Sequence, residues 1–206
     1  MNSFVDIFCS KVPLHLAMLR TLYRQLTGST LDCPRYGGHW EDIGFQGSDP
    51  ATDLRGVGLL GLVQALYLVI TPEMFPFARD VYQLSRKDSQ EFPLMVLSLN
   101  ITRITLHVLR DGLLNRFVAL EDGVWTTVNF FYCSLLYHVY HIWKSQHKTI
   151  SSSGFVLQEA ERFARANVGL VIKNFERFLN LNYSVAVKQS AREQIHKYTK
   201  VKVGRS

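Results

Sequence analysis

The sequence has few of the residues that interrupt helices or crosslink a chain. Its 206 residues include only 6 prolines, 13 glycines and 3 cysteines. The cysteines, Cys9, Cys33 and Cys133, lie far apart and form no C-x-x-C pair, which argues against a disulfide framework or a structural zinc site. Charged residues make up only 19% of the chain and hydrophobic residues 47%, so we expect one domain with a substantial buried core rather than disorder.

Motifs of several enzyme classes are also missing. The chain has no G-x-x-x-x-G-K-[ST], which excludes nucleotide binding in the P-loop manner, and no G-x-S-x-G nucleophile turn. His138 and His141 lie three residues apart, but no acidic residue shares their stretch, and two imidazoles rarely hold zinc alone. We therefore interpret these histidines as helix-packing residues and expect neither a metal nor a cofactor.

The net charge of +6 is concentrated at the C-terminal end of the sequence. Residues 185–206 hold six of the 23 lysines and arginines but only one of the 17 acids, so residues 1–184 carry 17 cations and 16 anions. A short basic terminus is typical of a solvated tail and, less often, of contact with anionic lipid or an acidic partner. No basic stripe with interleaved aromatics lies elsewhere, so we expect no nucleic-acid binding.

One uncharged segment raises the question of a membrane span. Residues 124–143 hold no Asp, Glu, Lys or Arg, and twenty such residues are long enough to cross a bilayer. The same segment contains two threonines, an asparagine, a serine and two histidines, so we favour a buried helix over a membrane span. The N-terminus lacks a basic stretch followed by an unbroken apolar run, so we expect no signal peptide and a cytoplasmic protein, at most peripheral at membranes or cytoskeletal structures.

Apolar residues recur at helical spacings along nearly the whole chain, and no alternating pattern requires a strand. We predict an all-α fold with orthogonal packing rather than a coiled coil, because no strict heptad persists. Residues 28–52 form the longest irregular segment, and such loops are more often functional than not. The first expected helix covers residues 13–26, with Pro13 in its first turn and Gly28 ending it. The other expected helices cover residues 52–70, 73–87, 93–118 with a bend or end at Gly112, 124–146, and a last stretch from residue 155 with Gly169 as its joint.

An acidic cluster lies where the irregular segment meets the next helix. Asp49 followed by Pro50 is a favourable N-cap with proline at the first helical position, and Thr52 or Asp53 could cap a later start. The cluster of Glu41, Asp42, Asp49 and Asp53 could bind a cation, but the interpretation that we favour is that these acids stabilise the positive end of the helix dipole.

Arg55 stands directly after these acids, at a helix start that disfavours a cation without a partner. Two interpretations stay open from the residues alone. Arg55 could form an ion pair with Asp49 or Asp53 and so hold the loop, which is the more common role of arginine. Alternatively, its permanently charged guanidinium could be presented to the phosphates of a partner.

The same stretch resembles the ELMO domain family. The resemblance rests on Trp40, Gly44-Phe45-Gln46, Asp49-Pro50, Thr52-Asp53, Arg55-Gly56, Gly58, Leu60-Gly61-Leu62 and Tyr67. Leu54 stands where the family tends to have phenylalanine, and Leu68 where an aromatic residue is common. On this basis we predict an N-terminal extension (1–10), an ELMO domain (11–182) and a basic C-terminal tail (183–206).

The resemblance implies an all-α module that acts on small GTPases of the Arf and Arl type in their GTP-bound form. It also implies GTPase-activating (GAP) activity, in which the arginine that matches Arg55 is the catalytic residue and the other matching positions shape the GTPase-binding region. Such a protein regulates hydrolysis by its partner and is not itself an enzyme. The alternative is a non-catalytic scaffold that binds a GTPase or an exchange-factor complex.

Overall fold

The structure is a computed structural model that describes residues 8–9, 11–119 and 123–181. Within these ranges the chain is helical and has no strand, which confirms the all-α prediction. A last helical stretch covers residues 168–181. The other elements are α1 (Pro13–Thr27), η1 (Gly38–Ile43), α2 (Pro50–Leu54), α3 (Gly58–Ile70), α4 (Phe75–Ser85), α5 (Leu94–Arg110), α6 (Asn115–Val118), α7 (Val124–Ser145), η2 (Ile150–Ser152) and α8 (Ser153–Ala166).

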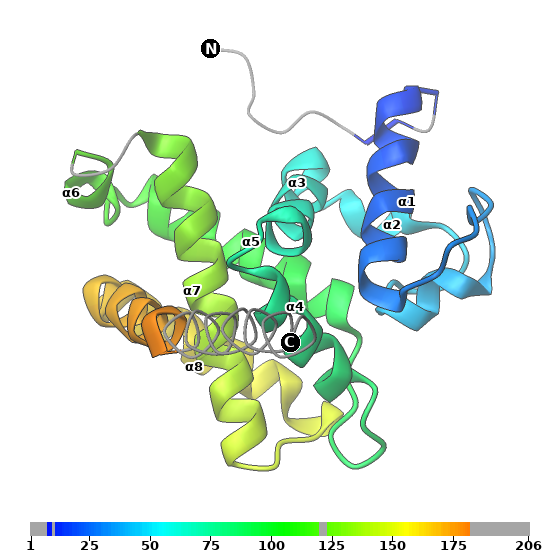
Figure 1. The fold of residues 1–206 in the computed structure, drawn as a ribbon. Coiled ribbons are helices and arrows are strands. Elements are labelled where there is room, and N and C mark those ends of the chain that lie inside the picture. The colour runs from blue at the N-terminus through cyan, green and yellow to red at the C-terminus, as the bar shows by residue number, and fades with distance from the viewer. Residues whose placement is uncertain (1–7, 10, 120–122, 182–206) are drawn as a thin grey trace, which may run out of the picture.

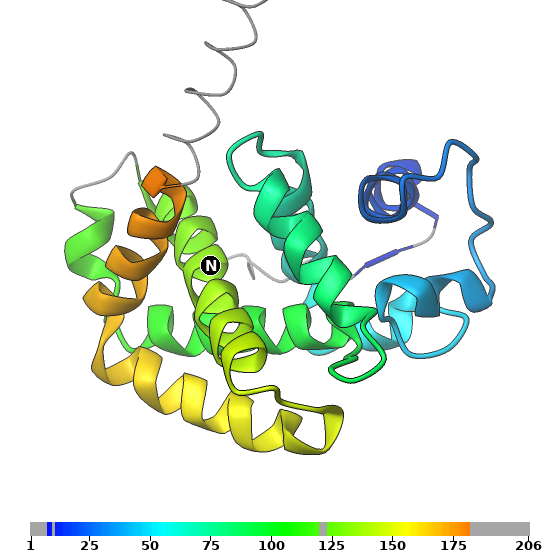
Figure 2. The ribbon, with the colours of Figure 1, turned by 60° about the horizontal axis from the view of Figure 1, so that its bottom comes forward.

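The helices cross one another steeply instead of running side by side as a bundle. In Figure 1, α1 lies at one side of the molecule and the stretch 168–181 at the other, with α3, α5 and α7 between them. After the rotation to Figure 2, α1 is seen nearly end-on while α5 runs across the page. The packing is therefore orthogonal, as predicted, and α3 and α5 lie between the N-terminal region and the C-terminal helices.

The uncharged segment predicted to be a buried helix forms α7, which lies in the core. Its Trp143 is fully buried and donates from Nε1 to the carbonyl of Gln90 at 2.9 Å, while the Trp143 carbonyl accepts from Gln90 Nε2 at 2.8 Å. Cys133 is also fully buried and packs as a small core residue. Among the described residues, no single helix is long and apolar enough to cross a membrane. The pair α3 and α4 meets that criterion only jointly, with a bend of 110° between them.

Several helix ends follow the prolines and glycines as predicted. Pro13 begins α1, and Gly28, at φ 76°, ends it with its N–H bonded to the carbonyl of Arg24. Gly112, at φ 71°, lies just beyond the end of α5, so the segment predicted as 93–118 divides into α5 and α6 there. Glycine adopts such left-handed conformations without the steric cost that a Cβ would add.

The prediction of one helix over residues 52–70 is wrong. The structure has a short α2 from Pro50 to Leu54 and begins α3 only at Gly58. Gly58 has φ 61°, and the preceding Val57 has φ −126° and ψ 0°, so neither continues a right-handed helix. The break places Arg55 and Gly56 in the turn between two helices.

The prediction of Gly169 as the joint of the last helices is also wrong. Helix α8 ends at Ala166, and the next stretch begins at residue 168. Asn167 forms the joint because its N–H and its Nδ2 both donate to the carbonyl of Phe163, at 2.9 and 3.2 Å, which closes the end of α8. At the other end of α8, Ser152 occupies the N-cap position without a side-chain capping bond.

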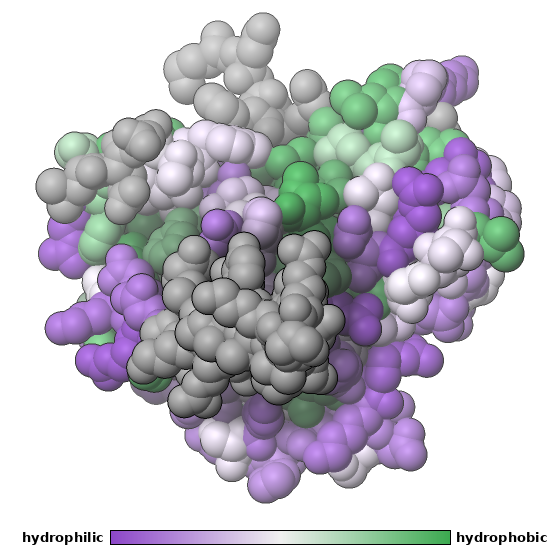
Figure 3. Space-filling model, viewed as in Figure 1, coloured by the Kyte–Doolittle hydropathy of each residue, from purple (hydrophilic) through white to green (hydrophobic). Residues whose placement is uncertain are grey.

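The surface is divided by polarity on the face shown in Figure 3, where apolar side chains gather over α1 and α3 and hydrophilic ones dominate the lower part. Val12 and Leu14, at the start of α1, are among the exposed apolar residues. The basic tail predicted for residues 183–206 lies outside the described residues, as does most of the N-terminal extension. Phe8 of that extension is buried, so its end packs on the domain.

Candidate functional site

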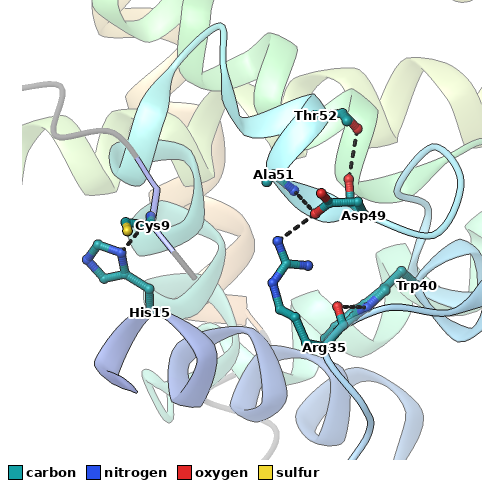
Figure 4. A network of polar contacts seen from close by, with 7 residues as sticks. All are labelled: Cys9, His15, Arg35, Trp40, Asp49, Ala51 and Thr52. Carbon is teal, nitrogen blue, oxygen red and sulfur yellow. Dashed lines mark hydrogen bonds and ion pairs between the residues drawn. The ribbon is translucent and has the colours of Figure 1, made fainter. Parts of the chain in front are cut away.

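The start of α2 is capped by Asp49, the first of the caps that the sequence allowed. Its carboxylate accepts a hydrogen bond from the N–H of Ala51 at 2.9 Å, and its backbone carbonyl accepts one from Thr52 Oγ1 at 2.8 Å (Figure 4). Pro50 follows as the first helical residue and is buried. These contacts fix the conformation of the chain immediately before Arg55.

The ion-pair partner of Asp49 is Arg35, a residue that no motif in the sequence indicates. Arg35 Nη2 lies 2.6 Å from Asp49 Oδ1, and its side chain is only 13% exposed (Figure 4). Its guanidinium also lies over the rings of Phe8 and Tyr36, at 5.2 and 4.6 Å from their centroids. Arg35 therefore joins the irregular segment and the N-terminal residues to the cap of α2. No local spacing signals this contact, because it joins residues 14 positions apart in a loop.

Asp53 is half-buried and is also satisfied without Arg55. Its Oδ2 accepts a hydrogen bond from the backbone N–H of Gln46 at 2.7 Å, which ties α2 to the loop before it. Burial raises the pKa of the Asp53 carboxyl above its ordinary value, the Gln46 hydrogen bond opposes that shift, and the nearby charge of Asp49 adds to it. Both acids that were expected to hold Arg55 are thus held by other groups.

Arg55 itself is exposed at the C-terminal end of α2. Among the described residues, none forms a hydrogen bond or an ion pair with its side chain. The geometry therefore does not show the proposed ion pair with Asp49 or Asp53, and the guanidinium keeps all five of its donors for solvent or a partner. Its backbone is held on both sides, by the capped α2 and by the start of α3.

The aromatic and glycine positions of the candidate site are buried and pack within the domain. Trp40 is fully buried, donates from Nε1 to the carbonyl of Arg35 at 3.0 Å, and meets the ring of Phe45 edge-on at 6.2 Å. Gly44 has φ 87°, and a Cβ at this position would lie 2.1 Å from the backbone nitrogen of Leu94. Its carbonyl accepts from Val96 N–H at 3.0 Å, so the loop packs directly on the first turn of α5.

The ten residues of the candidate site therefore differ in exposure. The structure brings them together within the short span from η1 to the start of α3, and only a minority of them face solvent. Gln46, Thr52 and Arg55 are exposed, Asp49 and Asp53 are half-buried, and Trp40, Gly44, Phe45, Pro50 and Gly58 are buried. Only the first group offers side chains to a partner without rearrangement.

Two hollows flank this region. The larger, of about 350 Å³, lies between the loop and the α4–α5 connection, and Gln46 is on its lining together with Glu41, Asp42, Arg86 and Glu91. The smaller, of about 150 Å³, lies between the α2–α3 turn and α5. Its lining consists of Asp53, Gly56, Val57, Val96, Leu99, Asn100 and Arg103. Arg55 stands in the chain between two of these lining residues.

The acidic cluster shows no metal-binding arrangement. Within the described ranges, no group of three or more His, Cys, Asp or Glu side chains is placed to hold a metal ion. Asp42 accepts a hydrogen bond from Tyr23 Oη at 3.3 Å. His138 stacks on Phe163 with the ring centroids 4.5 Å apart, and burial lowers its pKa, so it packs as a neutral ring.

The candidate site lies within the part of the chain that matches a known family. The chain belongs to the ELMO/CED-12 family, whose model matches residues 8–157. It is 47% identical over 156 residues to the human ELMO domain-containing protein 3 and 45% identical to the mouse protein of that name, covering 76% of this chain in each case. No solved structure matches it.

More distant relatives belong to the same group. ELMO domain-containing protein 2 of mouse is 30% identical over 132 residues, which cover 63% of this chain and 44% of that protein. ELMO domain-containing protein 1 of cattle is 28% identical over 156 residues, which cover 67% of this chain and 48% of that protein. The matched region spans only 41% of the length of the ELMO domain-containing protein 3 sequences.

Proposed function

We propose that this chain is a GTPase-activating protein for an Arf- or Arl-type small GTPase in its GTP-bound form, and that Arg55 supplies the catalytic arginine. Family membership supports the class of partner, since the resemblance implies action on these GTPases. The activity would take place in the cytoplasm or at the periphery of membranes. Hydrolysis would occur in the partner, because the chain has no P-loop of its own.

The main support for the proposal is that Arg55 is exposed and has no hydrogen-bond or ion-pair partner among the described residues. Its guanidinium is exposed and unpaired among the described residues, while the two neighbouring carboxylates are held by Arg35 and by the Gln46 N–H. An arginine that served only to hold the loop would be expected at one of these acids. The short turn between α2 and α3 limits the movement of the Arg55 backbone, so the binding of a partner costs little backbone conformational entropy there.

Phosphoryl transfer creates negative charge that an arginine can stabilise. Negative charge develops on the γ-phosphate oxygens and on the leaving bridge oxygen as the bond to the leaving group breaks. A guanidinium donates two parallel hydrogen bonds to such oxygens and stabilises the charge most strongly in the transition state. An arginine supplied in trans contributes on the order of 10³–10⁵ in rate.

Single-turnover GTP hydrolysis on a panel of Arf and Arl proteins tests the proposal. We expect the chain to accelerate hydrolysis by at least one of them, and Arg55→Ala to remove most of that acceleration. Arg110→Ala is the matched control, because Arg110 is likewise exposed and unpaired among the described residues but lies at the far end of α5. A panel without acceleration would overturn the GAP assignment.

Binding without acceleration would identify the alternative function. The buried positions of the candidate site stabilise the fold, so their presence is equally consistent with a non-catalytic scaffold. Affinity for each GTPase loaded with a non-hydrolysable GTP analogue should therefore be measured beside the rates. Tight, GTP-dependent binding with unchanged hydrolysis would favour a scaffold for a GTPase or an exchange-factor complex.

A further inference from the structure

We propose that Arg103 and the small hollow beside it form a second contact with the GTPase, in which Arg103 binds a carboxylate on the partner's protein surface. The inference rests on the proposed partner but concerns affinity instead of catalysis. It also holds if the chain is only a scaffold for the same partner.

Arg103 lies beside the α2–α3 turn that carries Arg55. Arg103 lines the small hollow together with Asp53 and Gly56, the residues that flank the segment of Arg55 in the sequence. It lies on α5, one turn beyond Leu99 and Asn100, which line the same hollow. The hollow thus lies between α5, which carries Arg103, and the α2–α3 turn, which carries Arg55.

The charge of Arg103 is uncompensated within the described part of the chain. Its side chain is exposed, and its one hydrogen bond there is a long one of 3.4 Å from Nη2 to Asn100 Oδ1, a neutral acceptor. Asp53 is the only acid on the lining of this hollow, and its carboxylate already accepts the Gln46 N–H. Arg103 is therefore a cation at the hollow without an ion-pair partner among the described residues, and it can pair with an anionic group on the partner.

The rest of the lining favours a protein surface as the occupant rather than a nucleotide. Val57 and Leu99 are buried and Val96 is half-buried, so the floor of the hollow is apolar. No atom lies within 4 Å of a Cβ built on Gly56, so the rim is open on that side. An aliphatic side chain in the hollow, with a neighbouring carboxylate on Arg103, fits this combination of an apolar floor and an arginine without an ion-pair partner among the described residues. Arg55 remains available for the phosphates.

The two arginines should affect different parameters of the same titration. The rate of single-turnover hydrolysis is measured against the concentration of the chain, which gives a half-saturating concentration and a plateau. We expect Arg103→Gln to raise the half-saturating concentration about tenfold with the plateau unchanged, corresponding to about 1.4 kcal/mol of binding free energy. Arg103→Glu should raise it further, whereas Arg55→Lys should lower the plateau.

Arg110→Gln is the matched control for charge, because Arg110 lies two helical turns further along the same face of α5. Its half-saturating concentration should stay within twofold of the wild type. Gly56→Leu tests the hollow independently of charge, since the added side chain would cover the apolar floor and weaken binding. Circular dichroism and thermal unfolding of each variant check that the fold is retained.

The outcomes separate this inference from the proposed function. If no GTPase is accelerated but GTP-dependent binding occurs, the GAP assignment fails, and Arg103→Gln should still weaken that binding about tenfold. If the wild type accelerates hydrolysis and Arg103→Gln leaves the half-saturating concentration within twofold, the inference is overturned and the GAP assignment stands. Loss of binding to anionic vesicles by Arg103→Gln, without loss of GTPase affinity, would assign the surface to lipid and also overturn the inference.

Discussion

Two of the helix interruptions in this molecule, at Asn167 and at Arg55–Val57, are built in different ways. At Asn167 the interrupting residue closes the helix end itself, through two hydrogen bonds to the carbonyl of Phe163. At the earlier break the neighbouring acids are satisfied by groups outside the turn, and Arg55 is left exposed. The break at Asn167 is therefore closed by hydrogen bonds of the interrupting residue, whereas the break at Arg55–Val57 leaves a charged side chain exposed between two helices.

The largest expected effect comes from the glycine that anchors the loop before the first break. Gly44→Ala should lower the free energy of unfolding by about 4 kcal/mol or more, because its Cβ would meet the backbone of Leu94 and φ is 87°. Gly47→Ala is the matched control, with φ 70° but no atom within 4 Å of the added Cβ, and should cost only about 1–2 kcal/mol. Chemical denaturation of both variants measures the difference, and equal losses would contradict the close approach to α5.

A smaller effect is expected from the ion pair that holds the cap of α2. Arg35→Gln should lower the free energy of unfolding by about 1.5–3 kcal/mol, since it leaves a partly buried carboxylate without its charged partner. Arg162→Gln removes an exposed pair with Glu159, in which the arginine is 77% exposed, and should cost at most about 0.5 kcal/mol. A loss for Arg35→Gln as small as that for Arg162→Gln would show that Arg35 does not fix the cap.

The smallest effect, and a pH-dependent one, is expected at Asp53. Burial raises the pKa of Asp53 in the folded state above its ordinary value of 3.8, so the folded chain binds this proton more tightly than the unfolded chain does. The contribution of Asp53 to stability is therefore fully present at low pH and is lost as pH rises through the folded-state pKa. The side-chain amide of the Asp53→Asn variant does not titrate and still offers an oxygen to the Gln46 N–H. The stability of this variant relative to the wild type should therefore increase with pH across the acid range. Denaturation curves at several pH values test the sign, and an opposite trend would contradict it.

The sequence predicted the parts of this comparison that depend on local chemistry. Pro13, Gly28 and the Asp49–Pro50 pair act through their own backbone conformations and caps, and the structure confirms each of them. The break before α3 was missed because Gly56 and Gly58 stand beside a long apolar run that favours a continuous helix, and the left-handed φ of Gly58 depends on packing.

The missed contacts of the site have a similar cause. Arg35 reaches Asp49 across an irregular loop, and Gln46 reaches Asp53 through its backbone N–H. Neither contact follows a helical or strand spacing, so no periodicity reveals it. The sequence is compatible with two roles for Arg55. Only the tertiary structure shows that Asp49 and Asp53, the expected partners of Arg55, contact other groups. Its catalytic role stays a prediction.

The most direct test of the account is the rate of GTP hydrolysis per folded, GTPase-bound molecule of Arg55→Lys. We predict normal folding and binding with a loss of acceleration of about 10² or more, equivalent to at least about 2.7 kcal/mol, because lysine lacks the planar fork of the guanidinium. Asn167→Ala, which alters the other interruption, should leave the rate per folded molecule unchanged. Near-normal turnover by Arg55→Lys on the same basis would contradict a catalytic role for Arg55.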